Sequence, residues 1–442
     1  MPRCVKIGRS FLHTYRKIYD KICKKLRQTP CWRNKVATAH ASARTQTYYK
    51  ENNTMITIDS ADKALKSYYL DVVSNSLNTK INPLLAKFEQ TSADVWGKEV
   101  RKVVSNGING GFGAGTETGD LPAASKHNYQ QMVLTLKNLY GTIEVTDKAV
   151  RAAAGNSGAF LSLLENEMEN LIRSAKLNFG RMLFGDGKGI LGNVSAVSGN
   201  VLTLDSVKGI FEGMIVDVVS DDSDSVVVGG RRVGSVDRTN KKIVLEGAVI
   251  ATNTIAEGNY VTVQGSYENE LTGLGAIFGS DSTLYGIDRD THKWLKPYTK
   301  TSTTITDAVI QGVIDTVEEN SGYYADMLVC SAGVKRAYID YLVTNRTNVE
   351  YMQLDDGTQA ISYQGIPMVS DRFCPSKTMY ALHTPSFRIY QLCDWRWLEG
   401  DDGKVLKQIG GKPVYNATLV KYADILCERP NAQGSVTNIT EA

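Results

Sequence analysis

The sequence predicts an α+β protein built from several structural units. Residues 157–184 carry apolar side chains at spacings of three and four, which is typical of a long amphipathic helix. Apolar and polar residues alternate on both sides of a glycine-rich stretch at 107–119, which is typical of paired strands. Residues 190–266 are short Val-rich runs separated by Gly, Asn and Asp, which indicates a small all-β unit.

Length and composition narrow the classes of protein. The chain has 442 residues, enough for two or three domains, with 42% hydrophobic and 22% charged residues, as in soluble globular proteins. No apolar run approaches the roughly 18 residues of a membrane-spanning helix. The seven cysteines have no tight spacing, which argues against a disulfide framework and favours a reducing cytoplasm.

Charge divides the chain at residue 54. Residues 1–54 hold 13 Lys and Arg against Asp20 and Glu51, a net charge of +11, whereas the remainder carries −8. Such a break is typical of a tail or processed segment. We expect 1–54 to be absent from the mature protein, either because Met55 is the true initiator or because a protease removes the segment. The alternative is that the tail stays and contacts nucleic acid.

An arm and a long hairpin should follow. In the arm, Asp59 or Ser60 is a suitable cap for a helix that Pro83 breaks or restarts. The alternation before and after the glycines then predicts an extended hairpin. A hairpin is too thin to bury its own apolar residues. We therefore expect a neighbouring subunit to cover its side chains, and the predicted assembly interface is Phe112, Tyr129, Met132, Leu134 and Leu136.

The helix at 157–184 should be the backbone of a domain. Its acidic residues lie in the first half and its basic residues in the second, as the helix dipole favours. The residues predicted to form its buried stripe are Leu164, Met168, Leu171, Ile172 and Phe179.

The rest of the chain alternates strands and helices. Thr306 should cap a helix, and a strand, a second helix and several β segments follow it. The predicted units are a basic extension (1–54), an N-terminal arm (55–95), an extended hairpin (96–150), the long helix (151–189), an inserted β domain (190–266), a mixed apical region (267–400) and C-terminal return strands (401–442).

Patterns for catalysis and cofactors are missing from the sequence. The glycine-rich stretch lacks a dinucleotide fingerprint, and GDGKG at 185–189 lacks the spacing of a phosphate-binding loop. Cys374, His383 and Cys393 are too far apart for a zinc clip. Trp395 and Trp397 alternate on a predicted strand, which favours core packing or a subunit contact. We predict no enzymatic activity, no cofactor and no metal.

The order of the units resembles that of the major capsid proteins of tailed bacteriophages, which have the Hong Kong 97-type fold. YGTIEVTDKAV resembles the strand that returns from the family's extended loop, and FLSLLENEMENLIRSAKLNFGRMLFGDGKG resembles its spine helix. TDAVIQGVIDTVEE with ADMLVCSAGVKRAYIDYL resembles its apical domain. YQGIPMVSDRF and CERPNA resemble a G-x-P-V strand and the closing segment. The block at 190–266 is an addition to the minimal pattern.

This resemblance implies a major capsid protein of a tailed phage, located in the virion and assembled in the host cytoplasm. Its subunits would form the hexamers and pentamers of an icosahedral shell around double-stranded DNA, without sequence-specific binding. Portal and scaffolding proteins would be partners, and no membrane would be involved. Two alternatives stay open: a cellular nanocompartment shell of the same fold, and a nucleic-acid-binding protein that uses residues 1–54.

Overall fold

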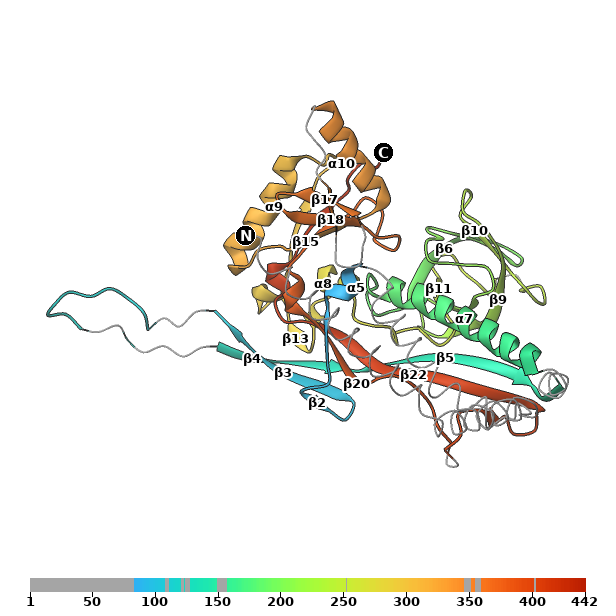
Figure 1. Ribbon diagram of the computed structural model, residues 1–442. Coiled ribbons are helices and arrows are strands. Elements are labelled where there is room, and N and C mark those ends of the chain that lie inside the picture. Colours follow the sequence, from blue (N-terminus) through green and yellow to red (C-terminus); the bar gives the residue numbers. More distant parts are fainter. Residues whose placement is uncertain are drawn as a thin grey trace, which may run out of the picture.

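The computed structural model describes residues 83–107, 111–120, 123, 128–148, 157–251, 253–345, 351–353, 359–400 and 403–442, with the backbone alone for 157–165. The basic extension and most of the expected arm lie outside these residues. The described chain forms a long sheet under a helix, an apical sheet above it and a barrel beside the apical sheet (Figure 1).

The long sheet is organised around one C-terminal strand. β22 pairs antiparallel with β20 on one side and with β5 along ten residue pairs on the other. β1 extends the sheet by pairing parallel with β20, although some 300 residues separate the two in sequence. The elements of this sheet, with the short helix before it, are α5 (Pro83–Lys87), β1 (Glu89–Thr91), β5 (Lys137–Thr146), β20 (Phe387–Trp397), β21 (Lys407–Gln408) and β22 (Val414–Cys427).

Helix α7 (Ser157–Met182) packs on this sheet, as expected of the long helix. Met168 and Phe179 are buried in the largest core, and Leu171 and Ile172 are half-buried against it. The side chain of Leu164 lies outside the described set. Phe179 meets Trp395 of β20 edge to face, with ring centroids 6.1 Å apart, so the helix and the sheet share one core.

The hairpin is shorter than the unit expected at 96–150. β3 (Glu99–Asn106) and β4 (Asn128–Thr135) pair over eight residues, from Glu99 opposite Thr135 to Asn106 opposite Asn128. β2 (Val95–Trp96) extends this small sheet at its base. The chain then passes Leu136 and joins the long sheet as β5.

The insertion at 190–266 is a closed barrel with its own core. Its strands follow the order β10-β7-β6-β11-β8-β9 around the barrel. The aliphatic side chains of Leu202, Val216, Ile243 and Val261 are fully buried inside it. The strands are β6 (Ile190–Ser198), β7 (Val201–Leu204), β8 (Ile215–Val219), β9 (Val226–Asp237), β10 (Lys242–Leu245) and β11 (Tyr260–Val263).

The two ends of the barrel leave it side by side. The Glu268 N–H donates to the Lys188 carbonyl (3.0 Å) and the Leu274 N–H donates to the Leu183 carbonyl (2.8 Å). A β-carbon at Gly273 would stand 2.4 Å from the Met182 carbonyl, so this junction requires glycine. The barrel is therefore inserted at one point of the chain.

The apical sheet contains seven strands and two capped helices. Thr306 caps α9 by accepting from the Val309 N–H (3.3 Å), and Ser331 caps α10 in the same way. The strands run in the order β14-β23-β19-β15-β18-β17-β16. The elements of this unit and of its connection to the barrel are α8 (Leu274–Phe278), β12 (Thr283–Leu284), β13 (Ile287–Asp288), β14 (Tyr298–Thr301), α9 (Asp307–Ser321), β15 (Met327–Cys330), α10 (Ala332–Thr344), β16 (Tyr351–Gln353), β17 (Gln359–Tyr363), β18 (Ile366–Ser370), β19 (Met379–Leu382) and β23 (Gly434–Thr437), with short 3-10 helices at Lys293–Leu295, Thr384–Ser386 and Pro430–Ala432.

The expected α+β fold class is confirmed. An extended hairpin, a helix along the long sheet, an apical α/β unit and an inserted β barrel occur in the expected order. The C-terminal return contributes β22 to the long sheet and β23 to the apical sheet, where it lies between the edge strand β14 and β19.

Candidate assembly surface

The hairpin has two faces of different character. On the inner face, Val100, Val104, Met132 and Leu134 are buried. They pack against the chain's own body, in one cluster with Leu284, Tyr285, Ile287, Leu295, Tyr390 and Leu426. A backbone hydrogen bond from the Val133 N–H to the Tyr285 carbonyl (2.9 Å) fixes this contact. The base of the hairpin is thus part of the subunit core.

Part of the predicted interface is therefore wrong. Met132, Leu134 and Leu136 are 0%, 4% and 7% exposed without any neighbouring subunit. The physical reason is that the loop after the barrel, with β12 and β13, covers the inner face of the hairpin. The sequence pattern identified an apolar face correctly, but it did not show that the same chain buries it.

The outer face carries the exposed apolar side chains. Trp96 is 76% exposed, Val103 58% and Tyr129 64%. Ser105 lies opposite Tyr129 and Val103 lies opposite Gln131, so Val103 and Tyr129 are diagonal neighbours on one face. Three large apolar groups on one face of the small sheet β2-β3-β4 form a surface that water solvates poorly. We call Trp96, Val103 and Tyr129 the outer stripe.

The tip of the hairpin extends beyond the body. In Figure 1 the hairpin runs away from the apical sheet and from α7, and residues 111–120 lie far from every other described element. Phe112 in this tip is 97% exposed. Of the five predicted interface residues, Phe112 and Tyr129 are thus the ones that the subunit leaves uncovered.

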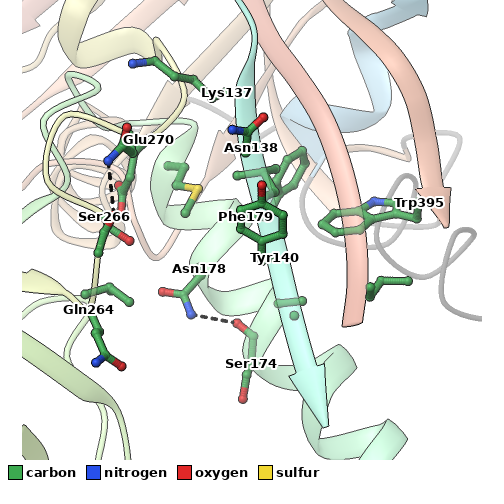
Figure 2. A pocket seen from close by; sticks show the side chains of 18 of the residues that line it. Lys137, Asn138, Tyr140, Ser174, Asn178, Phe179, Gln264, Ser266, Glu270 and Trp395 are labelled. Atoms are coloured by element: carbon green, nitrogen blue, oxygen red, sulfur yellow. Dashed lines mark hydrogen bonds between the residues drawn. The ribbon is translucent and has the colours of Figure 1, made fainter. Parts of the chain in front are cut away.

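A groove of about 600 Å³ lies between α7, β5 and residues 263–270. Figure 2 looks into it: the rings of Phe179 and Trp395 lie on one side, and Gln264, Ser266 and Glu270 lie on the other. Leu171, Ala175, Met182, Leu136 and Leu139 add to its apolar lining. Asn178 also faces the groove and donates to the Ser174 carbonyl (3.2 Å).

Charged groups fix the barrel side of this groove. Arg181 donates to Glu270 through its two terminal guanidinium nitrogens, and the distance from Nη1 to Oε2 is 2.8 Å. Lys137 Nζ donates to the Glu268 carbonyl (2.6 Å). The indole Nε1 of Trp395 is buried and has no hydrogen-bond partner among the described residues.

The tryptophan side chains of β20 and the cysteine side chains of β15 and β22 are packed in the protein interior. Trp395 and Trp397 are both buried, in agreement with core packing on one face of β20. Burial raises the pKa of the Cys330 and Cys427 thiols to about 12, so both stay protonated near neutral pH. In the part of the chain that the structure describes, no group of three His, Cys, Asp or Glu side chains is arranged to hold a metal ion.

None of the described helices combines the length and the apolar character that a membrane span requires. No protein-family model and no curated protein matches the chain.

The solved structures that resemble this chain include phage capsids and an encapsulin. The capsid of cyanophage A-1(L) matches with a TM-score of 0.46 at 13% identity, over 84% of this chain and 93% of that one. The procapsid of satellite phage P4, which includes a size determination protein, matches at 11% identity with a TM-score of 0.39, over 91% and 97%. The SrpI encapsulin of Synechococcus elongatus matches at 8% with a TM-score of 0.42, over 81% and 89%.

Sequence reasoning missed two members of the outer stripe. Val103 stands beside Val104, so it breaks the alternation that Val100 and Met132 share, and this break is the signal that it faces away from the core. Trp96 precedes Gly97, whose φ of +66° makes the turn between β2 and β3. An aromatic residue next to such a turn at a sheet edge is a reasonable candidate for a contact with another molecule.

Proposed function

We propose that this chain is the subunit of a closed protein shell, the major capsid protein of a tailed phage. The shell is icosahedral and encloses double-stranded DNA. In this proposal the subunits associate first into hexamers and pentamers, with portal and scaffolding proteins as further partners in the host cytoplasm.

The observation that carries the proposal is the uncovered hairpin. Its inner face belongs to the subunit core, whereas its outer stripe and Phe112 are exposed on an arm that reaches beyond the body. A monomer gains nothing from an ordered ribbon of exposed aromatic residues, because the exposed apolar surface favours association. In a shell, every subunit has neighbouring copies of the same chain, and such a copy is the partner that we propose for this surface.

The groove supports the same proposal from the other side of β5. It offers apolar walls to a segment that arrives from outside. An arm and a receiving groove at different places on one subunit make a head-to-tail contact, and such contacts close into rings when the rotation allows it. Rings of subunits are the capsomers of a shell.

The test is to remove the arm and keep the core. Asn106 faces Asn128 in register, so an Asn-Gly turn in place of residues 107–127 should close the shortened hairpin. We expect a subunit with the melting temperature of the wild type that no longer forms capsomers or particles in electron microscopy and analytical ultracentrifugation. Particle formation by this variant would overturn the proposal.

A matched control distinguishes the effect of the side chains at the tip from the effect of shortening the hairpin. Replacing residues 111–120 by a Gly/Ser segment of equal length keeps the reach of the arm and removes Phe112. We expect weakened assembly in this variant. Assembly at the wild-type concentration would place the contact in the strands and not in the tip.

The content of the particles tests the DNA part of the proposal. A phage capsid should protect double-stranded DNA from nuclease, whereas a nanocompartment should contain protein and no genome. The inserted barrel favours the phage, because nanocompartment shells of this fold usually lack such a unit. Particles from the native host that contain only a protein cargo would favour the nanocompartment.

A further inference from the structure

One barrel loop connects three parts of the subunit. Residues 207–211 follow β7 and lead toward β8. Val207 and Ile210 are buried in the barrel core, so the loop is anchored at both of these positions. Its other side chains point out of the barrel core.

The loop binds the apical unit through an aromatic ring and an ammonium group. The ring of Phe211 lies between two guanidinium groups, with Arg238 of the barrel 5.5 Å and Arg372 of the apical unit 5.4 Å from its centroid. Lys208 Nζ donates to the Cys374 carbonyl in the same apical loop, which joins β18 to β19.

The C-terminal end of the chain lies at the same contact. Burial raises the pKa of Glu441, but the hydrogen bonds from the Lys377 N–H (2.8 Å) and the Ser331 hydroxyl, together with the nearby Lys208 charge, bring it below its ordinary value. The positive charge of Lys208 is thus complementary to the Cys374 carbonyl and to the nearby Glu441 carboxylate of the apical unit.

The same loop also contacts the end of the long helix. Gly209 has a φ of +91°, and a β-carbon there would stand 3.0 Å from Cδ of Arg181. Arg181 is itself bound by Glu270 at the barrel exit. The loop therefore occupies the space between the end of α7, the barrel and the β18–β19 loop.

We propose that the barrel is a brace that fixes the angle between the apical unit and α7, and that residues 207–211 are its contact segment. Chain crossings such as the one at Thr384–Ser386, between β19 and β20, also connect the apical unit to the long sheet, and Tyr380 of β19 packs against Phe184 and Phe278 in the largest core. A brace at a second place stops rotation about these crossings. This inference goes beyond the proposed shell function, because it concerns a contact within one subunit and holds whether or not the subunit assembles.

Hydrogen exchange of the full chain, measured by mass spectrometry, tests the brace. In the variant Lys208→Gln/Phe211→Ala we expect peptides covering 371–378 to exchange about tenfold faster than in the wild type. Peptides of β8 (Ile215–Val219), inside the barrel, should keep their protection. Wild-type exchange at 371–378 would overturn the proposal, and so would loss of protection in β8, because the loop would then belong to the barrel fold alone.

Substitutions at Arg372 test the same contact from the apical side, and a substitution at Lys242 is the control. Arg372→Gln removes the contact from the apical side without touching the barrel, and it should accelerate exchange in residues 207–211, whereas Arg372→Lys should restore part of the protection because it keeps a cation near the ring. Lys242→Gln removes an exposed lysine of the same barrel and should change neither segment. Equal exchange in Arg372→Gln and in the wild type would also contradict the brace.

Discussion

Arg181 and Glu270 form a two-pronged ion pair that joins the end of α7 to the chain leaving the barrel. The two side chains are only 11% and 2% exposed, so water screens this pair little. Each charge stabilises the other, since a buried charge without a partner is strongly disfavoured. The pair therefore sets how the inserted barrel is attached to the helix.

Removing one partner should be costly. We expect Arg181→Ala or Glu270→Ala to lower the free energy of unfolding by about 3–5 kcal/mol, because each leaves the other charge buried and unpaired. Chemical denaturation followed by circular dichroism measures this loss. The double variant Arg181→Met/Glu270→Leu should recover much of it.

An exposed pair serves as the control for this prediction. Arg101 and Glu99 lie 3.2 Å apart with side chains 58% and 29% exposed. We expect Arg101→Ala to change the unfolding free energy by less than about 1 kcal/mol. Equal losses in Arg101→Ala and Arg181→Ala would mean that burial does not distinguish the two pairs.

The pH dependence of stability should contain a contribution from Asp424. Its carboxyl group accepts hydrogen bonds from the Thr272 N–H (2.7 Å), the Thr272 hydroxyl (2.9 Å) and the Ile425 N–H (2.8 Å). Complete burial outweighs these donors and raises its pKa to about 7. Below that pH the folded protein holds a proton that the unfolded chain releases at its ordinary pKa of 3.8.

Because the folded state holds this proton to a higher pH than the unfolded state, Asp424 makes the protein less stable as the pH rises. As the pH rises from about 4 to about 7, the unfolded state is ionised before the folded state, so this group lowers stability by up to about 1.4 kcal/mol per pH unit. We expect the pH profile of Asp424→Asn to be flatter than the wild-type profile between pH 4 and 7. Identical slopes for the two proteins in thermal melts would contradict the raised pKa.

The faces of the hairpin should respond differently to substitution. Val103→Ser/Tyr129→Ser changes two outer-stripe residues and should reduce assembly with little loss of subunit stability. Met132→Ala creates a cavity in the core, and we expect it to cost about 2–5 kcal/mol. Sedimentation measures assembly and thermal melting measures stability. A stable Met132→Ala subunit would show that the inner face is not covered.

Local elements were predictable from the sequence, and contacts between distant segments were not. The cap of α9 at Thr306 and the stripe of α7 at Met168 and Phe179 follow from short-range spacing, and the structure has both. The wrong part of the interface came from a long-range contact, because Leu284 and Ile287 cover strands more than 140 residues earlier. Alternation shows that a strand has an apolar face, but it does not show what covers that face.

The position of β23 in the apical sheet also depends on contacts between segments that are far apart in the sequence. It lies between β14 and β19 in the apical sheet, and Gly434 at its start lies under α9. A β-carbon at Gly434 would stand 2.6 Å from Cγ1 of Val313 and 2.9 Å from Cγ2 of Val317. No local pattern in the last ten residues indicates that the strand runs under a helix formed by residues 307–321.

Because of this close approach, position 434 should require glycine. We expect Gly434→Ala to destabilise the subunit by about 1–3 kcal/mol, because the branched side chains of Val313 and Val317 have no room to retreat. Val313→Ala in the same chain should restore part of the loss. Gly410→Ala is the control, since nothing lies within 4 Å of its β-carbon position. Equal melting temperatures for Gly434→Ala and the wild type would refute the close packing.

The barrel should fold when it is separated from the rest of the chain. Its strands close on themselves, its core of aliphatic side chains is complete, and its two ends are already paired at Lys188 and Glu268. A fragment of residues 188–268 loses the contacts of its loops with the apical unit and with α7, and the hydrogen bond from Lys137 of β5 to the Glu268 carbonyl. We expect dispersed amide signals in NMR spectra and a cooperative thermal transition.

The loss of the brace contacts should show in the same fragment. In the fragment Lys208 loses the Cys374 carbonyl, and Phe211 loses Arg372 but keeps Arg238, so Phe211→Ala should leave the melting temperature of the fragment nearly unchanged. Ile243→Ala, in contrast, opens the barrel core and should cost about 2–5 kcal/mol. A fragment with collapsed, undispersed signals would mean that the barrel needs the rest of the subunit to fold. An equal loss in both variants would mean that Phe211 supports the barrel itself.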